Sequence, residues 1–249
     1  MPGWWLDPAP GHGAGLAFRG LDPTHHEAEL QALTWLGLRL PGLYGCPPPG
    51  SASDGSDDDH CGAGGGAGPA WFLTPRGWPA DAPENQIQAR TTVAGLGRAL
   101  ARLHAVPPIG EVAHLDATGL VEAAGQRIEA GLVDPANFDR ARRHLAPQVL
   151  LDQLWALVPL LHQRCPVAAT VTHGRARPGT LWLERGELTA VIGVAGLAVA
   201  DPYRDLGAMA RHLASSYGPE ALPGFFAAYG LEQPDPIRVE FHALLDELH

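Results

Sequence analysis

Apolar residues recur at helical spacing through most of the last two-thirds of this chain, and one pair of short strands interrupts them. In residues 93–104, four aliphatic side chains fall along one stripe of a helix. Residues 181–184 and 188–192 flank the Arg185-Gly186 pair, which is typical of a β-hairpin. The pattern predicts an α+β fold dominated by helices. Further helices are expected at about 117–130, 147–164, 204–217, 220–229 and 235–248.

The first part of the chain has a different character. Residues 1–74 contain one capped helical pattern and two short strand patterns, near 16–19 and 70–74. Residues 47–69 are rich in Gly, Ser, Pro and Asp, a composition typical of a flexible acidic insertion. The sequence therefore predicts a short N-terminal β portion that carries this insertion, followed by a mainly helical portion over residues 75–249.

Composition limits the kinds of partner and of chemistry. The formal net charge of −10 disfavours nucleic acid as a partner. The sequence contains no run of 18 or more apolar residues, so no membrane span is expected. The three widely spaced cysteines favour a reducing, cytoplasmic compartment. All 17 basic residues in the Lys+Arg total are arginines, so a mechanism that requires a lysine is excluded. The oligomeric state stays open.

Four separated segments resemble the aminoglycoside phosphotransferases, especially their 3′-type enzymes, which are a branch of the protein-kinase-like fold. The segments are 96–105, 131–139, 171–206 and 241–249, and they occur in the family's order. The resemblance implies an α+β, kinase-like fold with a truncated N-terminal lobe. It also implies that the C-terminal helical lobe carries a remnant of the catalytic loop together with the substrate-side helices.

The resemblance implies transfer of the γ-phosphoryl group of ATP to an antibiotic hydroxyl, assisted by magnesium, but the catalytic motifs are degenerate. Arg175 occupies the position of the catalytic base, and arginine stays protonated. Thr180 and Gly193 occupy the positions of the two metal ligands, and glycine has no ligand atom. No catalytic or metal-binding set is therefore expected to be intact, and ATP and magnesium are not expected to bind productively.

Further positions of the family's pattern are the phosphate-contacting lysine, the helix glutamate and the residues that brace the catalytic loop. The position of the phosphate-contacting lysine falls near Arg19, and Glu29 matches its helix glutamate or is an ordinary exposed helix residue. His173 and Asp205 match residues that brace the catalytic loop. His104 belongs to no metal-binding pattern and is expected at the surface or at the edge of the core.

Acidic residues on the substrate side match the family better. Asp246 and Glu247 match the acidic C-terminus that recognises aminoglycoside ammonium groups. Asp134 and Asp139 lie in the loop that resembles the substrate-side insertion. The resemblance implies a cationic small-molecule ligand such as an aminoglycoside, and the alternative is that these residues are solvated surface charges.

Three functional interpretations remain open at this stage. The first is a catalytically inactive pseudokinase that binds a cationic small molecule, with Arg175 and Arg177 available to hold an anion. The second is an active ATP-dependent kinase with rewired metal binding, for which Asp201 is the nearest replacement carboxylate. The third is a decaying paralogue without a selected function. Enzymatic activity is therefore left undecided, although the family is a family of transferases linked to antibiotic resistance.

Overall fold

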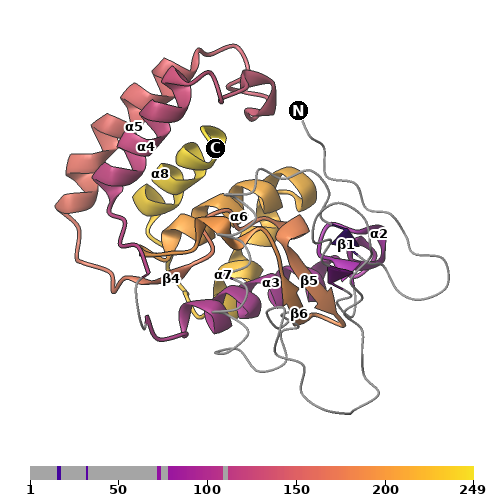
Figure 1. Ribbon diagram of the computed structural model, residues 1–249. Helices are drawn as coiled ribbons and strands as arrows, with labels where there is room; N and C mark the ends of the chain where they lie inside the picture. Colours follow the sequence, from indigo (N-terminus) through magenta and orange to yellow (C-terminus); the bar gives the residue numbers. More distant parts are fainter. Residues whose placement is uncertain (1–15, 18–31, 33–71, 74–77, 109–111) are drawn as a thin grey trace.

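The computed structural model describes residues 16–17, 32, 72–73, 78–108 and 112–249. Helices dominate this part, as Figure 1 shows, and its strands are short. The strands pair antiparallel with one another, and an isolated parallel bridge joins His114 to Val199. They are β1 (Leu16–Ala17) with β2 (Phe72–Leu73), β3 (Trp78–Pro79) with β5 (Leu181–Glu184), β5 with β6 (Glu187–Val191), and β4 (Thr170–Thr172) with β7 (Ala198–Ala200).

The helices expected after residue 75 are confirmed, with shifts of a few residues at their ends, whereas the helical pattern expected before it lies outside the described residues. The helix expected from residue 93 begins at residue 89, and the one expected from residue 220 begins as a 3-10 turn. The helices are α2 (Pro83–Gln86), α3 (Ala89–His104), α4 (Ala117–Glu129), α5 (Pro147–His162), α6 (Tyr203–Tyr217), α7 (Leu222–Tyr229) and α8 (Pro236–Glu247). The 3-10 turns are Pro135–Asn137, Pro178–Thr180, Val194–Gly196 and Pro219–Ala221.

Local sequence explains where two of these helices start. Asp116 caps α4 by accepting a hydrogen bond from the backbone N–H of Gly119 at 2.8 Å. Asp235 caps α8 by accepting from the N–H of Ile237 at 2.9 Å, and Pro236 follows it at the first helical position. The side-chain oxygens thereby satisfy backbone donors that have no partner within the helix.

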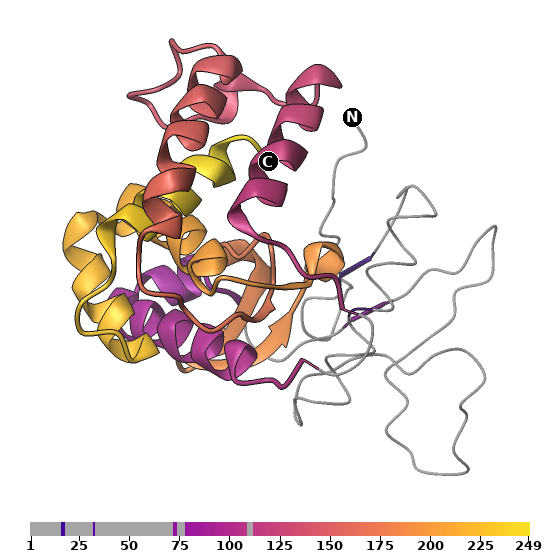
Figure 2. The same ribbon diagram turned by 90° about the vertical axis from the view of Figure 1, so that its left-hand side faces the viewer.

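Within the described residues, the core contains two hydrophobic clusters. One joins α3, α6 and α7 to the hairpin and includes Leu100, Met209 and Phe225. The other joins α4, α5 and α8 and includes Leu154 and Phe241. Figures 1 and 2 show α4 and α5 stacked beside α8, with α3, α7 and the strands at the opposite side of the molecule. The loop that follows β4 lies where these two parts meet.

Some predictions lie outside the described residues, and some strands were missed. The insertion at 47–69, the boundary at 74/75, and Arg19 and Glu29 all fall on residues that the structure does not describe. The strands β3, β4 and β7 were not individually predicted, because two or three residues carry too little periodicity to distinguish a strand. No described helix is long and apolar enough to cross a membrane.

Candidate functional site

A buried carboxylate holds the loop that follows β4. Asp205 lies in the first turn of α6, and none of its surface is exposed. Its carboxylate oxygens accept hydrogen bonds from the backbone N–H of His173 at 2.6 Å and of Gly174 at 2.9 Å. Two consecutive backbone donors bound by one buried side chain determine the direction in which the loop leaves β4.

The same carboxylate is bonded from α3. His104 Nε2 lies 3.1 Å from Asp205 Oδ2, and His104 Nδ1 lies 2.8 Å from the hydroxyl of Tyr229. Burial alone would raise the pKa of Asp205, but the hydrogen bond and charge of His104 hold it below the usual range, with help from Arg204. The expectation that His104 is an isolated residue at the surface or core edge is wrong, because it is buried and its partners are more than 100 residues away.

His173 braces the loop through both ring nitrogens. Its Nδ1 accepts a hydrogen bond from the backbone N–H of Arg175 at 3.2 Å, so Nε2 carries the proton and donates to the carbonyl of Ile192 at 2.8 Å. Burial lowers the pKa of His173, which favours this neutral form. The ring therefore connects the loop to the end of β6 and does not face solvent.

Arg204 is a bracing residue that the sequence reasoning missed. Its side chain is buried, and its Nη1 donates to Thr172 Oγ1 at 3.1 Å and to the carbonyl of Gly196 at 3.0 Å. Gly174 packs directly on this guanidinium, since a Cβ at Gly174 would lie 2.7 Å from Nη2. Its position next to Asp205 in a run that matches the family is the signal that could have identified it.

Arg175, the residue expected at the base position, lies in this braced loop but cannot act as a base. The side chain of Arg175 is exposed, and its backbone is fixed by His173. Partial burial and the charges of Arg127 and Arg177 lower the pKa of Arg175, yet a guanidinium remains protonated in proteins. Arg175 therefore cannot accept a proton from an attacking hydroxyl.

Thr180 and Gly193, the residues expected at the metal-ligand positions, are adjacent, but they do not fit magnesium. A Cβ at Gly193 would lie 3.5 Å from Thr180 Cγ2 and 3.9 Å from the ring of His173. The hydroxyl of Thr180 donates to the carbonyl of Arg177 at 2.9 Å and accepts from its N–H at 3.1 Å. Magnesium requires several oxygen ligands, usually including a carboxylate. Among the described residues, no group of three or more His, Cys, Asp or Glu could hold a metal ion.

Three of the four acidic residues that were expected on the substrate side come together, and arginines bind them. Asp246 accepts from Arg211 Nη1 at 2.6 Å, and Glu247 accepts from Arg142 Nη1 at 2.6 Å. Asp139 lies 3.0 Å from Arg211 Nε. Opposing the effect of burial, His212 and Arg211 lower the pKa of Asp246 to about 2. These residues form an ion-pair network between α6, α8 and the loop after the first 3-10 turn.

The network leaves some acidic side chains accessible and others not. The side chain of Glu247 is 0% exposed, whereas that of Asp139 is 36% exposed and that of Glu240 is 56% exposed. Burial raises the pKa of Glu247. Asp134 lies apart and caps the first 3-10 turn by accepting from the N–H of Ala136 at 2.9 Å. Glu247 therefore acts within the fold, while Asp139 and Glu240 present carboxylate oxygens to solvent.

The sequence of this chain matches a known protein family. A model described as the phosphotransferase enzyme family matches residues 20–242. A curated aminoglycoside 3′-phosphotransferase of Escherichia coli is 33% identical over 159 residues, which are 63% of this chain and 55% of that protein. One from Salmonella typhimurium is 28% identical over 167 residues, 67% of this chain and 57% of that protein. The chain spans little more than half the length of these relatives.

Solved structures confirm the predicted fold class. The phosphotransferase APH(3″)-Id from Streptomyces rimosus, in complex with ADP and streptomycin, matches with a TM-score of 0.68 and 20% identity over 98% of this chain and 92% of that one. An aminoglycoside-3′-phosphotransferase of type VIII matches with a TM-score of 0.69 and 22% identity over 100% and 95%. The chain therefore belongs to the phosphotransferase enzyme family and has the protein-kinase-like fold of its aminoglycoside phosphotransferases.

Proposed function

We propose that this chain is a pseudokinase, an aminoglycoside phosphotransferase-like protein that does not transfer phosphoryl groups. The observation that carries the proposal is the pair of residues at the reactive positions. Arg175 stands at the base position, and Gly193 stands at a metal-ligand position beside Thr180. A permanent cation and a residue without a side chain cannot perform these two roles.

The physical demands of phosphoryl transfer support this proposal. The reaction depends on positioning and on neutralising charge at the transferring group, to which magnesium contributes strongly. Loss of general-base catalysis alone typically costs roughly 10²–10⁴-fold in rate. Because such groups act as one unit, losing the metal ligands removes most of what the others achieve. The absence of lysine from the sequence also removes the usual phosphate contact.

An active kinase with rewired metal binding is the weaker alternative. It needs a replacement carboxylate, and Asp201 is the nearest candidate in the sequence. In the fold, Asp201 is ion-paired with Arg238 and accepts a hydrogen bond from the backbone N–H of Tyr203 at 2.9 Å. Removing Asp201 from these partners would leave the buried guanidinium of Arg238 with only the more distant carboxylate of Asp235, 3.8 Å from its Nε, which is costly.

We further propose that the chain binds a cationic small molecule such as an aminoglycoside. The accessible carboxylates of Asp139 and Glu240 support this proposal. They belong to a network of four acidic side chains, which are paired with only two arginines. A thermal-shift titration with kanamycin should raise the unfolding temperature, and Glu240→Gln should reduce the rise. No response to any aminoglycoside would favour the decaying paralogue. A cytoplasmic location is proposed as well, in keeping with the exposed free thiol of Cys165.

The decisive experiment measures ADP release. The purified protein is incubated with ATP, magnesium and kanamycin, and the expected rate equals that of a blank without protein. The Escherichia coli aminoglycoside 3′-phosphotransferase, assayed in parallel, provides the positive control. Clear turnover that disappears on denaturing this protein would falsify the pseudokinase proposal.

A further inference from the structure

The helix α5 is apolar on its inner side and also on its outer side. The inner side packs against α4 and α8 through buried residues such as Leu154 and Val158. The outer side carries Val149, Trp155 and Leu160, whose exposed fractions are 40%, 40% and 43%. Figures 1 and 2 show α5 along the outer edge of the molecule. A helix that is apolar all round is normally covered on every side, so the outer side of α5 is expected to meet a partner.

The exposed apolar residues of α5 lie together on one side of the helix. Val149, Ala156 and Leu160 are spaced by seven and then four residues, which places them in one row. Trp155 and Pro159 lie beside this row, are four residues apart and are also exposed. We call these five residues the α5 face. Single exposed apolar residues are ordinary on a protein surface, whereas a contiguous group of them marks an interaction site.

A hollow of about 830 Å³ continues the α5 face beyond the end of the helix. Leu160, Val167 and Ile237 contribute apolar side chains to its lining, and Val167 is exposed. The buried guanidinium of Arg238, which also lines the hollow, is ion-paired with Asp201. The apolar surface therefore extends from α5 to the first turn of α8.

The few charges on this surface have opposite signs at its two ends. Asp152 is the only Asp, Glu, Lys or Arg within α5, and its side chain is exposed. Arg164 follows the end of the helix, and its side chain is 41% exposed. Its Nε lies 3.3 Å from Asp235, while its Nη1 and Nη2 form no hydrogen bond or ion pair within the described residues. The guanidinium of Arg164 therefore has donors available to a second carboxylate.

This distribution of charge favours a second copy of the chain as the partner. When two α5 helices pack antiparallel, Asp152 of each copy approaches Arg164 of the other, and Ala156 lies opposite Leu160 in the same register. Parallel packing would place Asp152 beside the same residue of the second copy. The formal net charge of −10 opposes association of two copies. Residues 147–167 contain one Asp and one Arg, so this repulsion is small there.

We propose that the chain forms a symmetric homodimer in which the α5 faces of two copies pack antiparallel. Each copy contributes the same residues, so the assembly closes at two copies. One helix and one hollow per copy form an interface at the low end of interface sizes, so the dimer should dissociate on dilution. The α5 face includes no residue of the loop after β4 or of the acidic network, and the dimer is therefore independent of the proposed lack of transfer.

Sedimentation velocity of the full chain, in a dilution series from about 300 µM to about 1 µM, tests the proposal. The mass should increase with concentration from 26.3 kDa towards twice that value. Trp155→Gln should weaken the association by about tenfold or more, because tryptophan often carries much of the binding energy of an interface. Leu160→Gln should weaken it in the same direction.

Charge reversal tests the antiparallel arrangement. Asp152→Arg places two like charges where each ion pair is expected, so it should weaken the association, and so should Arg164→Asp. The double variant Asp152→Arg/Arg164→Asp exchanges the two charges and should recover most of the lost affinity. The single variants should keep the unfolding temperature of the parent protein at the lowest concentration, where the chain is monomeric.

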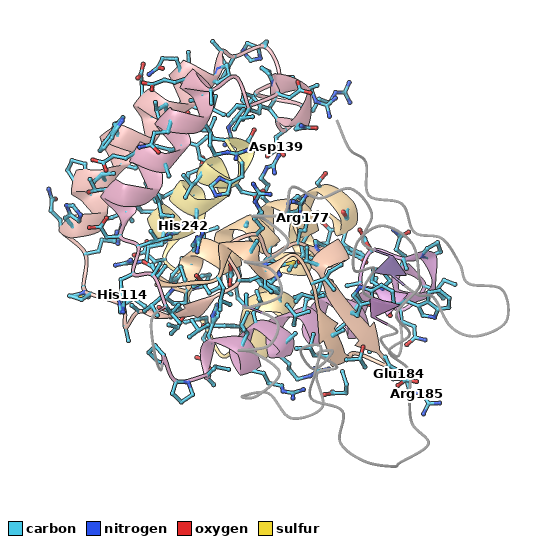
Figure 3. The ribbon with its side chains drawn as sticks, in the orientation of Figure 1. His114, Asp139, Arg177, Glu184, Arg185 and His242 are labelled. Atoms are coloured by element: carbon cyan, nitrogen blue, oxygen red, sulfur yellow. The ribbon has the colours of Figure 1, made fainter. Side chains whose placement is uncertain are left out.

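Matched controls come from the other side of the molecule. Ile87 follows α2 and is 86% exposed, and Figure 1 shows α2 across the molecule from α5. Arg185 lies in the turn between β5 and β6, and Figure 3 shows it at the tip of the hairpin, also far from α5. Ile87→Gln and Arg185→Glu make the same chemical changes and should leave the association unchanged.

Several results would overturn the proposal. A mass of one chain at every concentration would remove the dimer and leave the α5 face to a different protein. Association that persists in Trp155→Gln and Leu160→Gln would place the interface elsewhere. Stronger association in Asp152→Arg would contradict the antiparallel arrangement, and a mass beyond two copies would contradict closure. None of these measurements involves ADP, so their failure leaves the pseudokinase proposal untouched.

Discussion

The inner and outer parts of the loop after β4 differ in what they do for the protein. Inside, the buried Asp205 accepts hydrogen bonds from two backbone N–H groups and lies 3.1 Å from His104, while Arg204 anchors the loop from the same helix. Outside, Arg175 is exposed, and Gly193 contributes no side chain. The comparison teaches that the groups that shape this loop are separate from Arg175 and Gly193. The outer positions can therefore change while the fold persists.

The largest effect is expected from the inner network. Asp205→Asn places an amide where a carboxylate accepts from His173 and Gly174, so a buried donor loses its partner. We expect a loss of about 3–5 kcal/mol in the free energy of unfolding, measured by urea denaturation. Asp152→Asn, an exposed change on α5, is the control and should cost less than about 0.5 kcal/mol. A cost below about 1 kcal/mol for Asp205→Asn would mean that the inner network does not hold the loop.

A backbone position tests the same network by crowding. Gly174 has φ +88, and a Cβ there would collide with the carbonyl oxygen of Gly196 and with Arg204. Gly174→Ala should therefore destabilise the protein by about 2–4 kcal/mol in thermal unfolding. Gly131→Ala is the matched control, because Gly131 has φ +68 but nothing within 4 Å of a Cβ. It should cost about 1 kcal/mol, and similar costs at both sites would contradict the described packing.

Acid should weaken the core before it affects the ion pairs. Burial lowers the pKa of His242 to about 3, below its usual value of 6.5. Between pH 6.5 and pH 3, His242 binds a proton in the unfolded chain but not in the folded chain. The free energy of unfolding is therefore highest above about pH 6.5 and falls as the pH decreases. From pH 7 to pH 5 the loss should be about 2 kcal/mol. The measurement is urea denaturation at each pH.

A leucine variant isolates this contribution. His242→Leu removes the titrating ring and should flatten the decrease between pH 7 and pH 5. Some slope should remain, because burial and Arg175 lower the pKa of His249 to about 4. Asp246, whose pKa is about 2, should add its loss of stability only below about pH 4. An unchanged slope in the leucine variant would assign the acid sensitivity to other groups.

The smallest effect is expected from restoring the outer positions. Arg175→Asp together with Gly193→Asp supplies both missing carboxylates, yet ADP release should stay at the level of the blank. The hydroxyl of Thr180 remains bonded to Arg177, and no lysine contacts the phosphates. Turnover in this double variant would show that the two outer positions alone separate the chain from an active kinase, which would sharpen the contrast between inside and outside.

Local patterns in the sequence predicted much of the fold, but they could not predict contacts between residues far apart in the chain. Amphipathic spacing predicted α3 to α8 and the hairpin, because a helix or hairpin buries a face set by nearby residues. The short strands β3, β4 and β7 depend on pairing with remote segments, so their sequences carry little signal. The contact between His104 and Asp205 spans 101 residues, and no local pattern encodes it.

The acidic residues show the same division. Their match to the family's acidic C-terminus and substrate-side loop implied a ligand-facing surface. The fold places Arg142 and Arg211 against Glu247 and Asp246, so part of that charge is used inside the protein. Charge content can be read from a sequence, but the partner of each charge depends on which helices pack together.

The sequence by itself determined which chemistry is available at each position. Arg175 cannot accept a proton, Gly193 has no side-chain atom to bind a metal and no lysine exists, whatever the fold, because these are intrinsic properties of the side chains. Only the tertiary structure decided which groups meet. Burial around Asp205, the arginines beside Arg175 and the ion pairs of Asp246 arise from segments far apart in the chain, because pKa values and pairing depend on neighbours in space.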